Sequence, residues 1–408
     1  MTHRRNDEEL GTKAMCVSRT AGILLVILGC AVNKWTLEAT VVPDGRIESV
    51  SIEWAIAIVQ LSLMALGAGL FIRAPRFRMP TSSEWVLLVT SVLIGLGLVE
   101  VLWRFVGSGI QPMPLYVGQY KNRSSRNFVE DAQTGWRMRA NHEFQWIIDS
   151  HSNTYRSNRQ GFRSDRDFDA SHGLLIGLAG DSFTYGTGVD YSETFGDLVE
   201  RELAGGDVYN FAQPGFGIDQ MWMSVRHQIL PLMPDLIVVA FIDDDFTRSL
   251  NAYRTVEGFN KPRFLLDSGR IRPQTVDDVP NRFVLFLQVH SRLWQAFTSI
   301  STALREEYWD LNTAILKAIE ADCKHEGVPV LFIRLPEQTR RFDALDRWFD
   351  DYGLEFIDLG TPDVPADIHF KTDGHINAKG HRFVASAIIN WLRARQSNLL
   401  RRPQRYSR

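Results

Sequence analysis

The sequence predicts an α/β protein, in which a parallel sheet with helices on both faces follows an apolar N-terminal region. Two observations support this fold class. From residue 173 onward, short apolar runs alternate with segments of helical periodicity, an order typical of βαβ units. Before residue 107, three long apolar stretches are separated by polar and basic segments. We therefore expect an apolar region followed by one α/β domain.

Length and composition restrict the classes of function. The 408 residues suffice for one large domain and a further region. The formal net charge of -3 gives no electrostatic reason to expect a nucleic-acid partner. Cys16 and Cys30 lie in or beside the first apolar stretch and Cys323 lies far away, so no disulfide framework is predicted.

Residues 1–107 are predicted to form a membrane anchor. We expect transmembrane helices at about 14–35, 54–72 and 85–105. Over 54–72 and 85–103 the one charged residue is Glu100, and a buried helical hairpin is the alternative to two spans. The first stretch is shorter, and the residues before Cys30 resemble a lipoprotein cleavage site, so a cleaved signal is the alternative to a first span.

Basic residues predict the orientation of this anchor. Residues 1–19 are basic, and the loop at 73–83 holds three arginines and no acidic residue. Because basic loops remain in the cytoplasm, we expect both segments there. An odd number of spans then places everything after about residue 107 on the extracytoplasmic side of a cell membrane, and a cleaved first segment gives the same result.

The remaining chain divides into three parts. Residues 108–172 are polar and predict a lead-in segment of short strands and loops. Residues 173–396 form the α/β domain, with strands expected at 173–179, 207–211, 235–241, 328–334 and 354–358. Helices are expected at about 193–204, 219–230, 282–326 (more than one helix), 338–350 and 378–396. Residues 397–408 form a basic tail, predicted to end in solvent.

A candidate nucleophile follows the first strand of the α/β domain. The apolar run at 174–179 ends at Gly180 and Asp181, so Ser182 lies at the carboxyl end of the strand. Open parallel sheets bind ligands at this edge, and a serine there acts as a nucleophile where a histidine and a carboxylate can reach it. A phosphate-binding glycine loop is the alternative, but neither GxGxxG spacing nor a following GK[ST] is present.

Three sequence blocks resemble the SGNH, or GDSL-like, hydrolase superfamily. The segment GDSFTYGTGV at 180–189 resembles the first block, whose serine, here Ser182, is the nucleophile. The segment NFAQPGFG at 210–217 resembles the second, whose glycine, here Gly215, gives a backbone N–H to the oxyanion hole. This resemblance covers about residues 173–396 and implies a flavodoxin-like α/β/α fold.

The last block supplies the general base. In Asp373-Gly-His375 the resemblance implies that His375 is the base and that Asp373 orients it. The Asp-x-His spacing is shorter than the usual Asp-x-x-His and is similar to branches that acetylate or deacetylate bacterial exopolysaccharides. His369 and His381 are rival histidines, and His381 is interpreted as structural because it falls inside a predicted helix.

The third block departs from the superfamily. After strand 235–241 the superfamily places Asn-Asp, the asparagine amide being a third oxyanion donor, whereas this chain has three aspartates, with Asp244 at the asparagine position of the oxyanion hole. An ionised carboxylate cannot donate, and at about 4 Å from an oxyanion it would repel by roughly 4 kcal/mol at an effective dielectric of 20. A protonated Asp244, a rotated side chain, a bound cation or weakened catalysis would each accommodate this departure.

These features predict a membrane-anchored serine esterase. The expected substrates are O-acyl groups, O-acetyl above all, of a cell-envelope or secreted polysaccharide, and no cofactor or metal is expected. One alternative is an O-acetyltransferase of the same glycans that works with a membrane acyl-donor partner. The other is a non-catalytic glycan-binding or assembly protein, which the aspartate at 244 favours.

Overall fold

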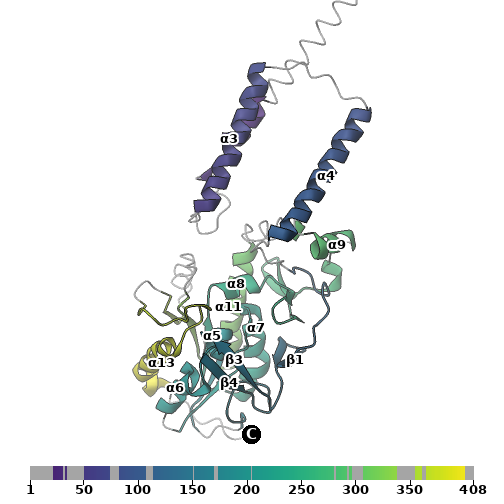
Figure 1. Cartoon of the computed structure of the whole chain (residues 1–408). Helices are drawn as coiled ribbons and strands as arrows, with labels where there is room; N and C mark the ends of the chain where they lie inside the picture. Colours follow the sequence, from purple (N-terminus) through teal and green to yellow (C-terminus); the bar gives the residue numbers. More distant parts are fainter. Residues whose placement is uncertain are drawn as a thin grey trace, which may run out of the picture. The chain divides into compact units, whose positions relative to one another are not determined.

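The computed structural model divides into two units, one within residues 1–111 and the other from residue 112 onward (Figure 1). The structure describes residues 22–30, 33–34, 50–73, 82–106, 114–149, 151–169, 173–203, 205–279, 282–291, 294–295, 307–337, 354–360 and 364–399.

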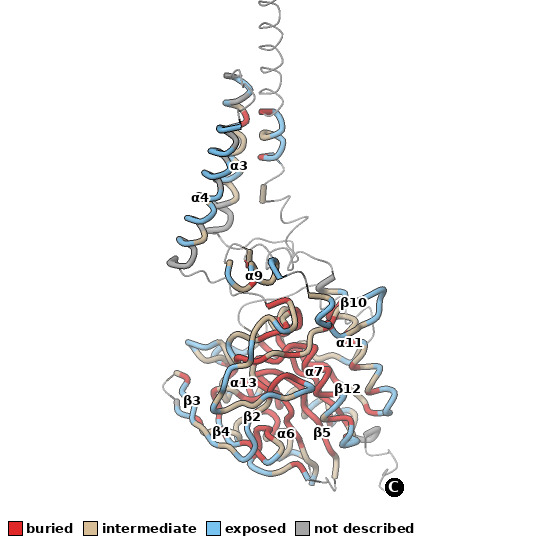
Figure 2. The backbone as a smooth tube through the Cα atoms, turned by 90° about the vertical axis from the view of Figure 1, so that its right-hand side faces the viewer, coloured by how far each residue is buried: buried red, intermediate tan, exposed pale blue. Residues whose placement is uncertain are grey.

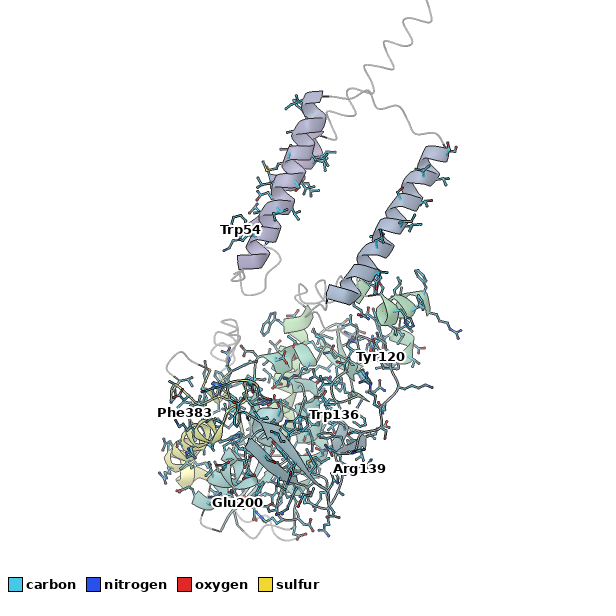
Figure 3. The ribbon with its side chains drawn as sticks, in the orientation of Figure 1. Trp54, Tyr120, Trp136, Arg139, Glu200 and Phe383 are labelled. Carbon is cyan, nitrogen blue, oxygen red and sulfur yellow. The ribbon has the colours of Figure 1, made fainter. Side chains whose placement is uncertain are left out.

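The N-terminal unit is helical. Helices α3 (Val50–Arg73) and α4 (Ser82–Val106) coincide with the second and third predicted spans, and residues 22–30 are also helical. Gly22 lies against the backbone of α3, where a Cβ atom would come within 2.6 Å of the Gly67 carbonyl oxygen. Apolar side chains of these helices are widely exposed, as Figure 3 shows for Trp54.

The three predicted spans are not supported by the structure. Within the described ranges, no helix combines the length and the apolar character needed to cross a membrane. Half of the first predicted span, at 14–35, lies outside the described residues.

The second unit is built on a five-stranded parallel sheet with the order β13-β12-β7-β5-β6. Its strands are β5 (Leu175–Gly180), β6 (Asp207–Asn210), β7 (Leu236–Phe241), β12 (Val330–Arg334) and β13 (Phe356–Asp358). All five agree with the predicted strands to within a few residues. Every residue of β5 and β7 is buried, because helices cover both faces of the sheet.

Alternate side chains of the central strand enter two separate hydrophobic clusters. Ile237, Val239 and Phe241 of β7 belong to one cluster, while Leu236 and Val238 belong to the other. Helices α7 (Ile218–Ser224) and α11 (Glu307–His325) supply the first, and α6 (Phe195–Glu202) and α13 (Ala378–Leu399) supply the second. The predicted α/β class with a parallel sheet is therefore confirmed, and Figure 2 shows the buried strands between their covering helices.

The observed helices agree with the prediction in part. The region 282–326 contains more than one helix, as expected, namely α9 (Arg282–His290) and α11, whereas α7 continues as a π-helix over Val225–Ile229. Short helices α5 (Ser182–Tyr185) and α8 (Asp244–Arg248) follow β5 and β7. The helix predicted at 338–350 lies outside the described residues.

In the described part of the chain, four antiparallel hairpins accompany the sheet, and the last of them packs on α11. They are β1 (Phe128–Asp131) with β2 (Gly135–Met138), β3 (Glu143–Ile148) with β4 (His151–Arg156), β8 (Tyr253–Arg254) with β9 (Phe259–Asn260), and β10 (Phe264–Asp267) with β11 (Arg270–Pro273). The lead-in segment thus has the short strands that its sequence predicts. Tyr155 of β4 stacks on Tyr185, with ring centroids 5.7 Å apart, so this hairpin is attached directly to α5.

Candidate active site

Ser182 lies where β5 ends, as the first residue of α5. The preceding Asp181 caps this helix, because its carboxylate accepts the backbone N–H of Phe183 at 2.9 Å. Glycine is required at position 180, since a Cβ atom there would lie 2.1 Å from Oγ1 of Thr184. The turn from strand to helix therefore fixes the serine at the sheet edge.

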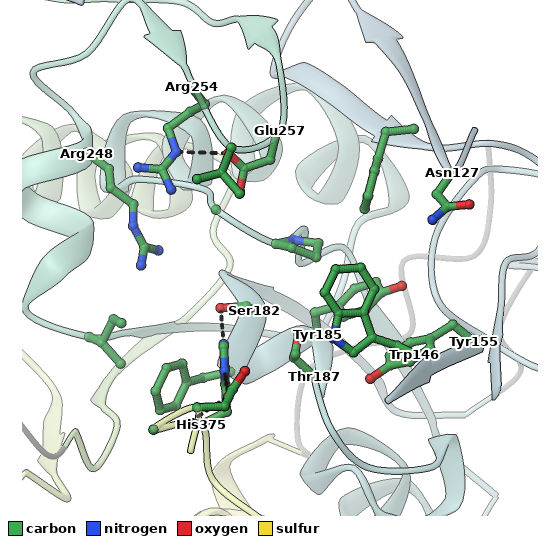
Figure 4. A pocket seen from close by; sticks show the side chains of 18 of the residues that line it. Asn127, Trp146, Tyr155, Ser182, Tyr185, Thr187, Arg248, Arg254, Glu257 and His375 are labelled. Atoms are coloured by element: carbon green, nitrogen blue, oxygen red, sulfur yellow. Dashed lines mark hydrogen bonds and ion pairs between the residues drawn. The ribbon is translucent and has the colours of Figure 1, made fainter. Parts of the chain in front are cut away.

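The structure brings Ser182, His375 and Asp373 together, and Figure 4 shows the contact between the serine and the histidine. The serine Oγ lies 2.8 Å from Nε2 of His375, and Nδ1 of the same ring contacts Oδ1 of Asp373. Burial by itself raises the pKa of Asp373, but the hydrogen bond and charge of His375 outweigh it, so the pKa is lowered and the carboxylate stays ionised. An imidazole held in this way can take a proton from the serine hydroxyl.

Several hydrogen bonds fix the loop that carries His375. The backbone N–H of Phe370 donates to the His375 carbonyl at 2.8 Å, and the side-chain amide of Asn377 donates to the carbonyls of Asp367 and His369. The Asn377 side chain also accepts the N–H of Lys379 at the start of α13. These hydrogen bonds hold the imidazole within hydrogen-bonding distance of the serine hydroxyl.

The two rival histidines have other partners. His381 is fully buried in α13, and its Nδ1 accepts the backbone N–H of Phe195 at 3.2 Å. Nε2 of His369 lies 3.1 Å from the carbonyl oxygen of Pro336. The structure therefore places His375, and neither rival, against Ser182.

Gly215 lies beside Ser182 on the pocket wall. Its φ of +80° is the left-handed conformation that favours glycine, and a Cβ atom there would lie 2.1 Å from a carboxylate oxygen of Glu257. Its N–H finds no acceptor among the described residues. The N–H of Ser182 lies in the first turn of α5, where the helix itself offers no acceptor.

Asp244 does not act as a hydrogen-bond donor in this structure, contrary to one of the sequence alternatives. Its carboxylate accepts from Oγ1 of Thr247 and from Nε of Arg248, both at 2.9 Å. Burial alone raises the pKa of Asp244, but Arg248 and Thr247 outweigh burial and lower it, so this carboxylate is ionised. The side chain is thus turned onto an arginine, as in the rotated arrangement that was one of the sequence alternatives.

The other two aspartates of the run are also engaged. Asp243 pairs with the buried Arg334 at 2.6 Å, and Asp245 accepts from Arg248 and from the N–H of Ile242. In the part of the chain that is described, no group of three or more His, Cys, Asp or Glu side chains is arranged to hold a metal ion.

A pocket of about 580 Å³ opens over Ser182 and His375. One wall is aromatic and comes from the hairpins and α5, with Phe128, Phe144, Trp146, Tyr155 and Tyr185. The opposite wall is charged, with Arg248, Arg254 and Glu257 (Figure 4), and Glu337 also lines the pocket. The Trp146 side chain is 49% exposed, which leaves its face available to a ligand.

The charged wall contains an acid of unusual pKa. Burial, together with Asp243, Asp244 and Asp181, raises the pKa of Glu337 to about 7. Its carboxylate accepts the backbone N–H of Asp243 at 3.1 Å. Sequence reasoning identified none of the charged residues on this side of the pocket, because they are not part of a quoted motif; a weak signal was Arg248, one helical turn after Asp244.

Solved structures similar to this chain include lipolytic enzymes. A lipase/acylhydrolase from Enterococcus faecalis has 17% identity and a TM-score of 0.32, covering 54% of this chain and 96% of its own. A member of the lipolytic protein G-D-S-L family from Veillonella parvula has 15% identity and a TM-score of 0.30, covering 53% and 97%. An acetyl xylan esterase has 14% identity and a TM-score of 0.32, covering 54% and 100%.

These neighbours include the G-D-S-L family that the sequence blocks resemble. No protein-family model and no curated protein matches the chain. Because the identities and TM-scores are low, we base the functional argument on the geometry of the site.

His381 makes the fold sensitive to acid. Burial, with Arg163 and His375, lowers its pKa from 6.5 to about 3, so the unfolded chain binds a proton more readily than the folded one. The free energy of unfolding therefore falls as pH drops below 6.5, and from pH 7 to 5 this residue should account for about 2 kcal/mol. Urea unfolding at both pH values should show a smaller loss in His381→Gln than in the wild type.

The exposed His325 provides the matched control. The variant His325→Gln should keep the wild-type pH dependence. Equal pH dependence in the wild type and in His381→Gln would contradict the neutral, buried state of His381.

Proposed function

We propose that this chain is a serine ester hydrolase of the SGNH type. The observation that carries the proposal is the contact between Oγ of Ser182 and Nε2 of His375 at 2.8 Å, with Asp373 against the other ring nitrogen. This is the arrangement of a nucleophile, a general base and the group that orients the base. The resemblance of the three sequence blocks supports the same conclusion.

The reaction follows from these positions. Oγ of Ser182 bonds to the ester carbonyl carbon as its proton passes to Nε2 of His375, and the carbonyl oxygen becomes an oxyanion. The tetrahedral intermediate then collapses, the alcohol leaves with the proton from His375, and an acyl-serine remains. A water molecule then attacks the acyl-serine as His375 takes its proton, and collapse of the second intermediate releases the acid and returns the proton to Ser182. Backbone N–H groups of Ser182 and Gly215 stabilise both oxyanions.

We propose O-acetyl groups of a polysaccharide as the substrate. The Asp-x-His spacing supports this choice by resemblance. The pocket also supports it, because about 580 Å³ is far more than an acetyl group needs, so the remaining space would hold the alcohol part of the ester. The aromatic face of Trp146 lies opposite an ion pair, in which Nε of Arg254 is 3.1 Å from Oε2 of Glu257. A sugar ring has apolar faces and hydroxyl groups at its edges, so it suits both walls.

An acyltransferase would use the same triad. A glycan hydroxyl would then replace water in the second half of the reaction, and a membrane partner would have to supply the acyl group. Hydrolysis needs only water, which is why we favour it.

We also propose that the N-terminal unit associates the chain with a cell membrane. The charge-poor stretches of the sequence support this, as do the exposed apolar side chains of α3 and α4, since such surfaces are disfavoured in water. The close approach of Gly22 to Gly67 is typical of helices that pack in lipid. The α/β unit would then act on the extracytoplasmic side.

The triad assignment predicts that Ser182→Ala and His375→Ala each lower turnover of p-nitrophenyl acetate by at least about a thousandfold. Because triad members act as a unit, the double variant should be hardly slower than either single one. Ser386→Ala, on the exposed part of α13, is the control and should behave as wild type. Covalent labelling of Ser182→Ala by a serine-directed phosphonate would contradict the assignment.

The substrate assignment predicts that Trp146→Ala lowers kcat/KM for an acetylated oligosaccharide about tenfold, through KM, and has a smaller effect on p-nitrophenyl acetate. Ile147, the next residue of β3, is 69% exposed and points to the opposite side of the strand, so Ile147→Ala is the matched control. A wild-type preference for p-nitrophenyl octanoate over the acetate would instead indicate an acyl-chain pocket.

The membrane proposal predicts a specific topology. A reporter that is active only outside the cytoplasm should function when fused after residue 120 and should fail when fused near residue 78. A reporter active only in the cytoplasm should give the opposite pattern at the two sites. Reversal of both patterns would refute the orientation and the extracytoplasmic substrate.

A further inference from the structure

The guanidinium of Arg248 lies where the elements of the oxyanion hole converge. Its Nη1 donates to Oδ2 of Asp181 at 3.0 Å and to the carbonyl of Phe216 at 3.1 Å. Asp181 immediately precedes Ser182, and Phe216 immediately follows Gly215.

The third neighbour of this guanidinium is Asp244. Nε of Arg248 donates to Oδ2 of Asp244 at 2.9 Å, and Nη2 lies 2.9 Å from the same oxygen. Asp244 stands where the superfamily has its oxyanion asparagine. The guanidinium therefore borders all three positions from which that superfamily donates hydrogen bonds.

Arg248 also faces the nucleophile. Its side chain is only 11% exposed, and that remaining surface lines the pocket together with Ser182 and His375. Figure 4 shows the side chain reaching from α8 toward the part of the pocket above the serine. One oxygen, Oδ2 of Asp181, contacts both Nη1 of Arg248 and Oγ of Ser182, at 3.0 and 3.3 Å. The guanidinium and the nucleophile are thus only two hydrogen-bond lengths apart.

One N–H group of Arg248 is available for a ligand. A guanidinium carries five N–H groups. Asp244 can engage Nε and one hydrogen of Nη2, while Asp181, Asp245 and the Phe216 carbonyl surround Nη1. For the second hydrogen of Nη2, no further acceptor is found among the described residues.

We propose that Arg248 is the third oxyanion donor of this site, in place of the asparagine amide, and that Asp244 is the residue that positions it. This inference rests on the proposed hydrolase. It explains the aspartate at the asparagine position, since the carboxylate that cannot donate instead holds a group that can. A guanidinium is always charged, so it attracts the oxyanion more strongly than a neutral amide does.

The surrounding charges are compatible with this role. Although burial lowers the pKa of Arg248, Asp245, Asp181 and Asp244 outweigh burial and raise it, so the cation persists. Burial and the charge of Asp181 raise the pKa of Asp245 well above its usual range.

The test compares full-length wild type with Arg248→Lys and with the double variant Arg248→Gln/Asp244→Asn, which removes one charge of each sign. With p-nitrophenyl acetate, kcat should fall about a hundredfold to a thousandfold in each, with KM within threefold. A boronic acid, which becomes a tetrahedral anion on Ser182, should lose affinity by a similar factor. A neutral acetamide analogue of the substrate should not. Arg201→Gln, on the exposed face of α6, is the control.

Thermal unfolding separates this role from a purely structural one. If Arg248 only holds the aspartates, the double variant should have altered stability but near-wild-type kcat, and that result would overturn the inference. Equal losses of affinity for the boronic acid and the neutral analogue would overturn it as well.

The single variant Asp244→Asn distinguishes two roles for position 244, because kcat should change in opposite directions for a direct donor and for a residue that positions Arg248. An asparagine that itself donated to the oxyanion would raise kcat, and that outcome would refute the inference. If Asp244 positions Arg248, kcat should fall about tenfold, because a charge-assisted hydrogen bond is lost.

The proposed hydrolase can fail independently of this inference. Absence of ester turnover in the wild type, with boronic acid binding retained in Ser182→Ala, would refute the hydrolase itself. Turnover in the wild type that depends on Ser182 but not on Arg248 would refute only the role of the arginine.

Discussion

Parallel pairing of β5 with β6 on one side and β7 on the other is the constraint on which the site depends. Parallel strands end at the same edge of a sheet, so the loops that follow these three strands must meet there. Those loops contain Ser182, Gly215 and Asp244, which are far apart in the chain. The loop before α13 adds His375 at the same edge, where its ring reaches the serine.

This constraint also explains what the sequence could predict. A strand buried on both faces appears as a short apolar run, and the loops after such runs carry the motifs, so the five strands and the serine–histidine–aspartate group were accessible to pattern reasoning. The rival histidines were separable only in part: helical placement identified His381 as structural, whereas His369 required the observed contact with Pro336.

The pocket walls were not predictable, for a physical reason. Trp146 and Glu257 lie on hairpins whose position depends on tertiary contacts, such as the stacking of Tyr155 on Tyr185, and no local pattern encodes such contacts. Asp244 illustrates the same limit at a single residue. Its position in the third sequence block left several roles open, because the direction of a side chain is set by its neighbours, and here Arg248 and Thr247 bind its carboxylate.

The charged side chains at this edge of the sheet affect both the stability of the fold and the proposed reaction. Asp181 and Asp245 are fully buried, and each contacts the guanidinium of Arg248. Leaving a buried carboxylate unpaired costs about 3–5 kcal/mol, so the fold cannot easily lose this arginine once the aspartates are present. Asp181 in turn caps the helix that begins with Ser182. The fold must therefore retain Arg248 to pair its buried aspartates. The same pairing holds the guanidinium where, in the proposed reaction, the carbonyl oxygen of the ester becomes negative.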